Sequence, residues 1–265
     1  MTPEKAMTLR KLFSSDAIPI GHLIFEFATP GIGYLVKNAS ADFMIFDLEH
    51  SGFTFETAKR AIVSARAAGL PIVVRVPSHD AKDLARACDI GADGVMVPVV
   101  RSVEQARSIV AAVKYSPEGR RGVGMLQMHD RYRAGAFADK ARAANEAMVV
   151  IIQIESGDGA DAADAIAALP GVDCLWVGHM DLSCSLGTPG SFDTPQFRAA
   201  VDKVVAATKR HGKRAGRLAP NASECAALAA AGFDCLALGT DTSVYLSALA
   251  QGIDALRTQL GDRRK

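Results

Sequence analysis

Short apolar runs alternate with Ala-rich amphipathic segments along the chain. The apolar runs predict eight β-strands, at residues 19–25, 42–46, 71–76, 94–99, 148–154, 174–177, 214–218 and 235–238. The amphipathic segments predict helices at residues 57–68, 82–88, 103–115, 160–168, 194–211 and 222–231. Strands that alternate with helices pair in parallel through right-handed crossovers. Eight such units in 265 residues predict one α/β domain, residues 1–265, with the architecture of a (β/α)8 TIM barrel.

Composition and charge narrow the class of protein further. The chain is 49% apolar with a net charge of +1, so it gives no electrostatic reason to expect a nucleic-acid partner. No apolar run reaches membrane-spanning length, and residues 1–10 lack the apolar core of a secretory signal. The five cysteines show no CxxC spacing, which favours a reducing compartment. We therefore expect a cytoplasmic protein that does not bind membranes.

Two carboxylates stand just past predicted strands. Glu155 follows the run at residues 148–154, and Asp181 follows the run at residues 174–177. The C-terminal ends of parallel strands meet at one end of a barrel, where the chemistry of such barrels collects. Mg²⁺ often takes only one or two protein carboxylates and leaves its other positions to water and substrate. We predict that Glu155 and Asp181 share one divalent cation; the alternative is two separate helix caps or surface charges.

A second polar cluster follows the second and third predicted strands. Asp47, Glu49 and His50 lie at the exit of one strand, and Arg75 ends the next. Alternation places Asp47 and Glu49 on the same face. A buried, unpaired guanidinium is costly, so Arg75 either pairs with Asp47 or faces a ligand. We predict a catalytic group of Asp47, His50 and Arg75, with a purely structural Asp47–Arg75 ion pair as the alternative.

Other features bear on the type of reaction. None of the predicted strands contains a lysine, which a Schiff-base aldolase would need there, so a metal is the expected electron sink. Asp89 has a helical context and is a cap or a solvated residue unless it reaches back to His50. The irregular stretch at residues 116–135 is expected near the catalytic face, where the amides of Gly122 and Gly124 could cradle a carboxylate or a bound water.

Several motifs resemble, in the same order, those of the HpcH/HpaI aldolases, the metal-dependent class II pyruvate aldolases. The matching segments are Phe46-Asp47-Leu48-Glu49-His50, Val74-Arg75-Val76-Pro77, Gly91-Ala92-Asp93-Gly94, Arg121-Gly122-Val123-Gly124, Gln153-Ile154-Glu155 and Gly178-His179-Met180-Asp181-Leu182-Ser183. They span most of the chain, and together they are specific although each alone would be weak. The resemblance implies a barrel of the phosphoenolpyruvate/pyruvate type, often with the last helix exchanged between subunits in a hexamer built as a trimer of dimers.

The resemblance also implies residue roles. Glu155 and Asp181 would bind Mg²⁺, Mn²⁺ or Co²⁺, and His50 would be the general base, oriented by Asp47 and Asp89. Arg75 would stabilise a pyruvate enolate. Gln153 would hold the pyruvyl group.

The chain also departs from the family pattern, which usually reads Gly-Pro-Ser/Ala-Asp before the metal aspartate. Here Met180 replaces the small residue of Gly178-His179-Met180-Asp181, and Arg217 stands where an aliphatic residue is usual. Together with Gln153, the expected substrate contacts are Gly178, Met180 and Arg217. Glu26 and Arg217 are predicted to bias the acceptor pocket toward a polar aldehyde, with a buried ion pair as the alternative.

These features predict a carbon–carbon lyase. The expected reaction is metal-dependent, reversible aldol cleavage of a 4-hydroxy-2-oxo acid of the 2-keto-3-deoxy acid type to pyruvate and an aldehyde. One alternative is a citrate-lyase-β-like lyase acting on a CoA thioester, and another is a non-catalytic metabolite-binding barrel. The sequence names neither the aldehyde nor the metal.

Overall fold

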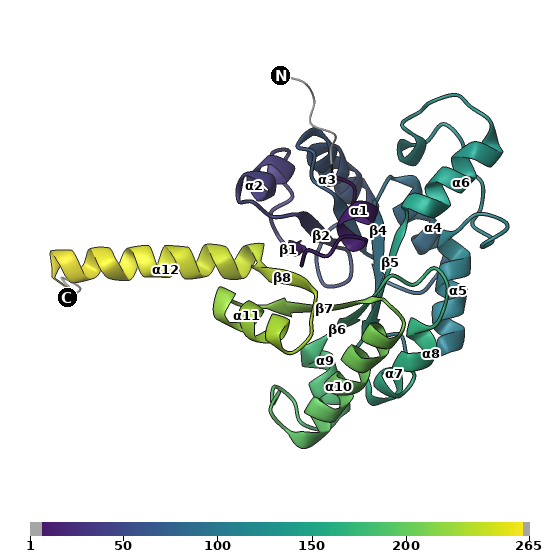
Figure 1. The fold of residues 1–265 in the computed structure, drawn as a ribbon. Helices are drawn as coiled ribbons and strands as arrows, with labels where there is room; N and C mark the ends of the chain where they lie inside the picture. The colour runs from purple at the N-terminus through teal and green to yellow at the C-terminus, as the bar shows by residue number, and fades with distance from the viewer. Residues whose placement is uncertain (1–6, 262–265) are drawn as a thin grey trace.

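The computed structural model describes residues 7–261 and contains a closed barrel of eight parallel strands (Figure 1). Each strand pairs with the next in the sequence, and β8 closes the ring by pairing with β1. The strands are β1 (Ile20–Ile24), β2 (Phe43–Asp47), β3 (Ile72–Arg75), β4 (Gly94–Val97), β5 (Val149–Ile154), β6 (Cys174–Val177), β7 (Arg214–Ala219) and β8 (Cys235–Thr240). The predicted barrel is confirmed, and every strand lies within two residues of its predicted limits.

All the helices except α12 lie around the barrel, and each of the six predicted ones is present. They are α1 (Leu9–Phe13), α2 (Ile32–Asn38), α3 (Phe55–Ala67), α4 (Ala81–Asp89), α5 (Val103–Val113), α6 (Phe137–Ala147), α7 (Gly157–Asp161), α8 (Ala163–Ala167), α9 (His179–Ser185), α10 (Pro195–Arg210), α11 (Ala222–Ala230) and α12 (Asp241–Leu260), with a 3-10 turn, η1 (Met128–Asp130). The helix predicted at residues 160–168 is two short helices, α7 and α8. Helices α1, α2, α6, α9 and α12 were not predicted.

Side-chain caps fix where many of the helices begin. The N-cap residue in these cases has an extended backbone, and its side-chain oxygen accepts a hydrogen bond from a backbone N–H of the first turn, which has no partner within the helix. The capping residues are Thr8 of α1, Thr54 of α3, Asp80 of α4, Ser102 of α5, Ser156 of α7, Thr194 of α10, Asn221 of α11 and Thr240 of α12. All except Thr8 stand between a strand and the helix that returns from it, so these caps lie at the C-terminal end of the barrel.

The strands separate two apolar cores. One fills the barrel interior and includes Phe43, Val73 and Trp176, and the other lies between the strands and the helices. Trp176 fills the interior so tightly that a β-carbon at Gly216 would collide with its ring. Helix α1 packs Leu9 into the N-terminal end of the interior core. Helix α1 therefore covers the interior core at that end, whereas a cavity opens at the C-terminal ends of the strands.

The loop between α5 and α6 lies at the N-terminal end of the barrel. A helix that follows a barrel strand runs back along it, so the end of α5 lies beside the start of the strands. The N–H groups of Arg120 and Arg121 donate to the carbonyls of Ala111 and Lys114 at that end of α5. The prediction that residues 116–135 lie near the catalytic face, with Gly122 and Gly124 as a cradle, is wrong within one chain.

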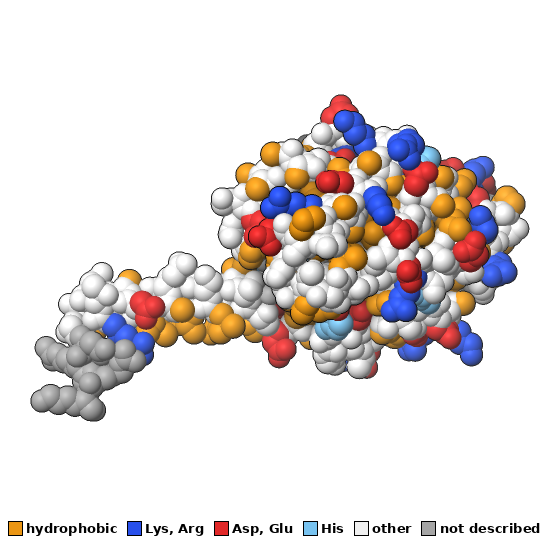
Figure 2. All heavy atoms as spheres, turned by 90° about the horizontal axis from the view of Figure 1, so that it is seen from below, with side chains coloured by type: hydrophobic (Ala, Val, Ile, Leu, Met, Phe, Trp, Pro, Cys, Tyr) orange, Lys and Arg blue, Asp and Glu red, His pale blue; other side chains and the backbone are white. Residues whose placement is uncertain are grey.

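Helix α12 projects away from the barrel (Figure 1), and Figure 2 shows hydrophobic side chains along it. Of its residues, only Asp241 is buried. None of the helices in residues 7–261 is long and apolar enough to cross a bilayer. The projecting helix therefore leaves an apolar surface uncovered by its own barrel.

Candidate active site

A cavity of about 220 Å³ opens at the C-terminal end of the barrel. Side chains from β1, β3, β5, β6 and β7 line it, together with the turns that follow β2 and β6. Of the predicted site residues, it brings together His50, Arg75, Gln153, Glu155, Gly178, Met180 and Asp181. These residues are separated by up to 131 positions in the sequence, and the closure of the barrel places them around one space.

Glu155 is the buried carboxylate of the cavity. Its Oε2 accepts the N–H of Val99 at 2.7 Å, and its Oε1 accepts from the side-chain amide of Gln153. A β-carbon on Gly178 would collide with Oε1, so the glycine leaves the room that this carboxylate occupies. Burial raises the pKa of Glu155, and the nearby charge of Asp181 adds to the shift. A cation beside Glu155 would offset this cost of keeping it ionised.

Asp181 completes a pair of carboxylates. It lies in the first turn of α9 and is exposed, while Glu155 is only 5% exposed. The Oε1 of Gln153 is buried and accepts no hydrogen bond within residues 7–261, so one more oxygen lacks a partner beside the pair. In the same residues no group of three or more His, Cys, Asp or Glu side chains could hold a metal. Two carboxylates and an amide oxygen fit a hard cation that keeps water or substrate as further ligands.

Arg75 both forms an ion pair with Asp47 and faces the cavity, so the two predicted roles hold together. Its Nε donates to Oδ1 of Asp47 at 2.6 Å, and Asp47 is fully buried. Asp47 also accepts the backbone N–H groups of Glu49 and His50, at 3.1 and 2.8 Å. The Nη2 of Arg75 is buried without a partner within residues 7–261, and Arg75 lines the cavity. The ion pair thus anchors the guanidinium while one amino group remains available to a ligand.

Glu49 is a functional candidate that the sequence analysis left without a role. Its Oε2 lies 3.3 Å from Nε of Arg75 and 3.6 Å from Nε2 of His50. Burial raises its pKa, and the charge of Arg75 opposes that rise. His50 is exposed and lines the cavity. Its imidazole ring is approached by Glu49, whereas Asp47 accepts a hydrogen bond only from the backbone N–H of His50. The alternation Asp-x-Glu was the available signal, since it puts both carboxylates beside Arg75.

Two predicted site residues lie elsewhere within this chain. Asp89 ends α4 at the N-terminal end of the barrel, where it pairs with Arg121. Since His50 lies at the opposite end, Asp89 does not orient it within one chain. Arg217 faces outward from β7, because Gly216 and Leu218 take the inward positions of that strand. Neither residue lines the cavity.

Arg217 lies beneath the outer helices. Its guanidinium is 5.7 and 5.8 Å from the ring centroids of Phe192 and Phe197, and its Nη2 is 3.9 Å from Glu224. Glu26 is exposed beyond β1 and does not line the cavity either. The predicted role of Glu26 and Arg217 in the acceptor pocket is therefore wrong within one chain. The alternative, a buried ion pair, does not form here either, because Glu26 is exposed and the side chain of Glu224, the loose partner of Arg217, is 39% exposed.

His179 lines the cavity and was named only as a departure from the family pattern. Its ring lies edge-on to Phe192, with centroids 5.1 Å apart. Burial lowers the pKa of His179 to about 4, and the positive charge of Arg217 adds to that shift. At the two positions where the family pattern has a proline and a small residue, this chain therefore has a neutral imidazole, His179, and Met180.

Comparisons with known proteins agree with this geometry. A family profile described as HpcH/HpaI aldolase/citrate lyase matches residues 29–248. The chain is 36% identical to the hydroxypyruvate/pyruvate aldolase of Chromohalobacter salexigens, covering 86% of this chain and 89% of that protein. It is 33% identical to the 5-keto-4-deoxy-D-glucarate aldolase of Klebsiella pneumoniae subsp. pneumoniae, covering 83% and 85%. The crystal structure of an HpcH/HpaI aldolase from Desulfitobacterium hafniense DCB-2 superposes with a TM-score of 0.89 at 30% identity, covering 95% of this chain and 97% of that one.

Proposed function

This chain belongs to the HpcH/HpaI aldolase/citrate lyase family, and we propose that it is a carbon–carbon lyase that cleaves a 4-hydroxy-2-oxo acid to pyruvate and an aldehyde. The relatives named as aldolases of hydroxypyruvate, pyruvate and 5-keto-4-deoxy-D-glucarate support a substrate of the 2-keto-3-deoxy acid class. The observation that most supports the proposal is the buried Nη2 of Arg75, which has no partner in the described part of the chain and belongs to a side chain lining the same cavity as Glu155, Asp181 and His50.

Glu155 and Asp181 are the residues that would hold the metal. A divalent cation bound there, Mg²⁺, Mn²⁺ or Co²⁺, would supply Lewis-acid polarisation of the 2-oxo group. Gln153 presents an unpaired Oε1 beside them and orients Glu155 through its amide. Carboxylate and amide oxygens do not distinguish strongly among these ions, so the metal in the cell depends on supply.

Arg75 and His50 perform the remaining steps. As the C3–C4 bond breaks, negative charge develops on the 2-oxo oxygen, and the Nη2 of Arg75 donates a hydrogen bond to it. Asp47 fixes the guanidinium beforehand, so no reorganisation is needed during the reaction. His50 accepts the proton of the C4 hydroxyl, directly or through water, with Glu49 beside its ring. After the aldehyde has formed, the same proton returns to C3 of the enolate, which completes pyruvate and restores the base.

The size of the cavity bears on the CoA-thioester alternative. At about 220 Å³, the space lies below the usual range for drug-sized ligands. That volume suits a short oxo acid better than a CoA thioester. Pure metabolite binding would not require a base, an arginine and a carboxylate pair around one small space.

The test is release of pyruvate from a panel of 4-hydroxy-2-oxo acids, with and without added Mg²⁺, Mn²⁺ and Co²⁺. We expect release only with a divalent cation, and no inactivation by borohydride in the presence of pyruvate. Covalent trapping of pyruvate on a lysine would refute the mechanism. Cleavage confined to CoA thioesters would support the alternative.

We also propose that α12 pairs with a second copy of the chain in the cytoplasm. Leu246, Leu249, Ile253, Leu256 and Leu260 recur every three or four residues along it, and all are exposed. Beside its base, an apolar hollow of about 380 Å³ is lined by residues of β1, α2 and β8. Such a repeat needs an apolar partner surface. Light scattering should give an oligomer, such as a trimer of dimers, which Ile253→Glu should dissociate.

A further inference from the structure

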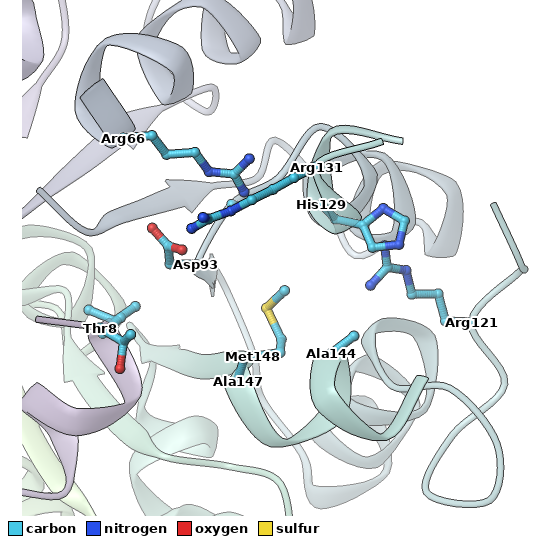
Figure 3. A pocket seen from close by; sticks show the side chains of 11 residues that line it. Thr8, Arg66, Asp93, Arg121, His129, Arg131, Ala144, Ala147 and Met148 are labelled. Atoms are coloured by element: carbon cyan, nitrogen blue, oxygen red, sulfur yellow. The ribbon is translucent and has the colours of Figure 1, made fainter. Parts of the chain in front are cut away.

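A second cavity of about 220 Å³ lies at the N-terminal end of the barrel, opposite the candidate active site (Figure 3). Its polar lining comes from Arg66 near the end of α3, Asp93 before β4, and Arg121, His129 and Arg131 of the α5–α6 loop. In Figure 3, Arg66 and Arg131 approach each other near Asp93, while Arg121 and His129 lie together at the other side of the cavity. The mechanism proposed above uses none of these side chains.

The arginines of this cavity are only partly neutralised. Arg66 donates to the carbonyls of Met128 and Gly91, both at 2.8 Å, and both acceptors are neutral. Arg131 has no ion pair and no side-chain hydrogen bond within residues 7–261. Arg121 pairs with Asp89. Among the described residues, only one of the three guanidinium groups therefore has an anionic partner within hydrogen-bond distance.

The nearby carboxylates do not balance this charge. Asp93 accepts the backbone N–H of Ile72 at 3.0 Å, and burial raises its pKa. With Asp89 and Asp93 both ionised, the three arginines still leave one net positive charge around the cavity, because Asp130, which also lies near His129, is paired with Lys140. Burial and the charge of Arg121 lower the pKa of His129, so that ring adds no positive charge at neutral pH.

Two buried nitrogens facing this region also lack partners. The side chain of Arg121 is 1% exposed, and its Nε has no hydrogen-bond acceptor within residues 7–261. The Nδ1 of His129 is likewise buried without a hydrogen bond in the described chain. Most buried polar groups in native proteins are paired. A ligand with acceptor oxygens would pair both nitrogens.

We propose that this cavity binds a small phosphorylated acid, with its phosphate between Arg66 and Arg131 and its carboxylate toward Nε of Arg121. A phosphate presents acceptor oxygens on all sides, so it can accept from two guanidinium planes at once, which suits arginine geometry. The wall formed by Leu9, Ala144 and Met148 gives a short carbon chain an apolar surface. This site is separate from the aldolase site and does not depend on the proposed reaction.

The test is calorimetric titration of the full-length protein with 2-phosphoglycolate, glycerol phosphate, inorganic phosphate and malonate at constant ionic strength. Saturating pyruvate and Mg²⁺ are present throughout, so that the Arg75 cavity is filled. We expect one phosphoglycolate per chain, with weaker binding of the ligands that lack either the phosphate or the carboxylate.

Two variants with a matched control locate the site. Arg131→Gln removes a charge without breaking any side-chain hydrogen bond or ion pair of the described chain, and should weaken phosphoglycolate about tenfold. Arg133→Gln changes an arginine of the same loop that does not line the cavity, and should leave affinity unchanged.

Arg121→Lys keeps a charge for Asp89 but removes Nε, and should weaken phosphoglycolate more than glycerol phosphate. Absence of binding, or equal binding by the Arg131 and Arg133 variants, would overturn the proposal.

Discussion

Arg75 and Arg217 are equally buried, at 7% exposed, and each lies within a strand of the same barrel. Arg75 pairs in register with Asp47 of β2 and turns toward the interior, where an amino group stays free in the cavity. Arg217 pairs in register with Val177 of β6 and turns outward, beneath α10 and α11. The comparison shows that burial and strand membership do not identify a catalytic arginine, whereas the face of the strand does.

The largest loss should follow a change on the inner face beside Arg75. Glu155→Gln removes one of only two carboxylates and should lower both Mn²⁺ affinity and kcat/KM by at least about a hundredfold. Mn²⁺ binding followed by electron paramagnetic resonance, together with pyruvate release, checks this. Since Gln keeps the shape that Gly178 accommodates, the fold should persist. Wild-type Mn²⁺ affinity in this variant would exclude Glu155 as a ligand.

Arg75→Lys should separate the two functions of Arg75. A lysine can still neutralise Asp47, but it cannot also place a second donor where Nη2 lies. We expect kcat for exchange of the pyruvate methyl protons with D₂O to fall about 10²–10³-fold, the effect of losing one oxyanion donor. Proton NMR measures the exchange, and thermal unfolding reports the fold. Undiminished exchange would leave Arg75 with a structural role only.

His179 lines the cavity, and the charge of the outward-facing Arg217 acts on its pKa. The effect of His179 should appear in the pH dependence of stability. Its folded-state pKa of about 4 lies below the unfolded value, so the unfolded chain binds the proton first as pH falls. The free energy of unfolding should therefore decrease from about pH 6.5 down to about pH 4, by about 2–3 kcal/mol. Urea unfolding of wild type and His179→Gln measures this, and parallel pH profiles would contradict it.

Arg217→Met should have the smallest effect on catalysis. It leaves the cavity lining intact, so kcat/KM should stay within about threefold for polar and apolar substrates alike. Methionine fills a similar volume, and the 3.9 Å pair with Glu224 is weak, so unfolding free energy should change by about 1 kcal/mol or less. Steady-state kinetics over a substrate series checks the first expectation. A selective loss with polar substrates would restore Arg217 to the acceptor pocket.

Several features of the fold and site could be read from local order in the sequence. The segment Asp47-Leu48-Glu49-His50 at the end of β2 and the carboxylates after β5 and β6 could be assigned to the site from the sequence. A barrel brings the C-terminal ends of its strands together at one end, so polar residues at those ends lie close to one another. Arg75 could be paired with Asp47 in advance, because neighbouring strands bring their last residues into register. The strands themselves were predictable, because short apolar runs separated by amphipathic helical segments are typical of buried parallel strands and of few other structures.

The face of Arg217 was not predictable in the same way. Strand β7 carries small or apolar residues on both sides of its two arginines, as parallel strands covered on both faces do, so its alternation gives no inward side. Only the packing of Trp176 against Gly216 fixes which residues point inward. Helix α6 was not predicted either, because its sequence shows no clear apolar face: its buried residues are Ala141 and Asn145.

The sequence by itself determined the barrel, the order of its strands and the residue types at their C-terminal ends, because local patterning specifies these. The same order of elements implied that Asp89 and the loop at residues 116–135 lie at the N-terminal end, since each helix runs back along the strand before it. Only the tertiary structure decided that Glu49 touches both Arg75 and His50, that Arg217 faces outward, and that α12 leaves the barrel. Those facts depend on contacts between residues distant in sequence, which no local pattern encodes.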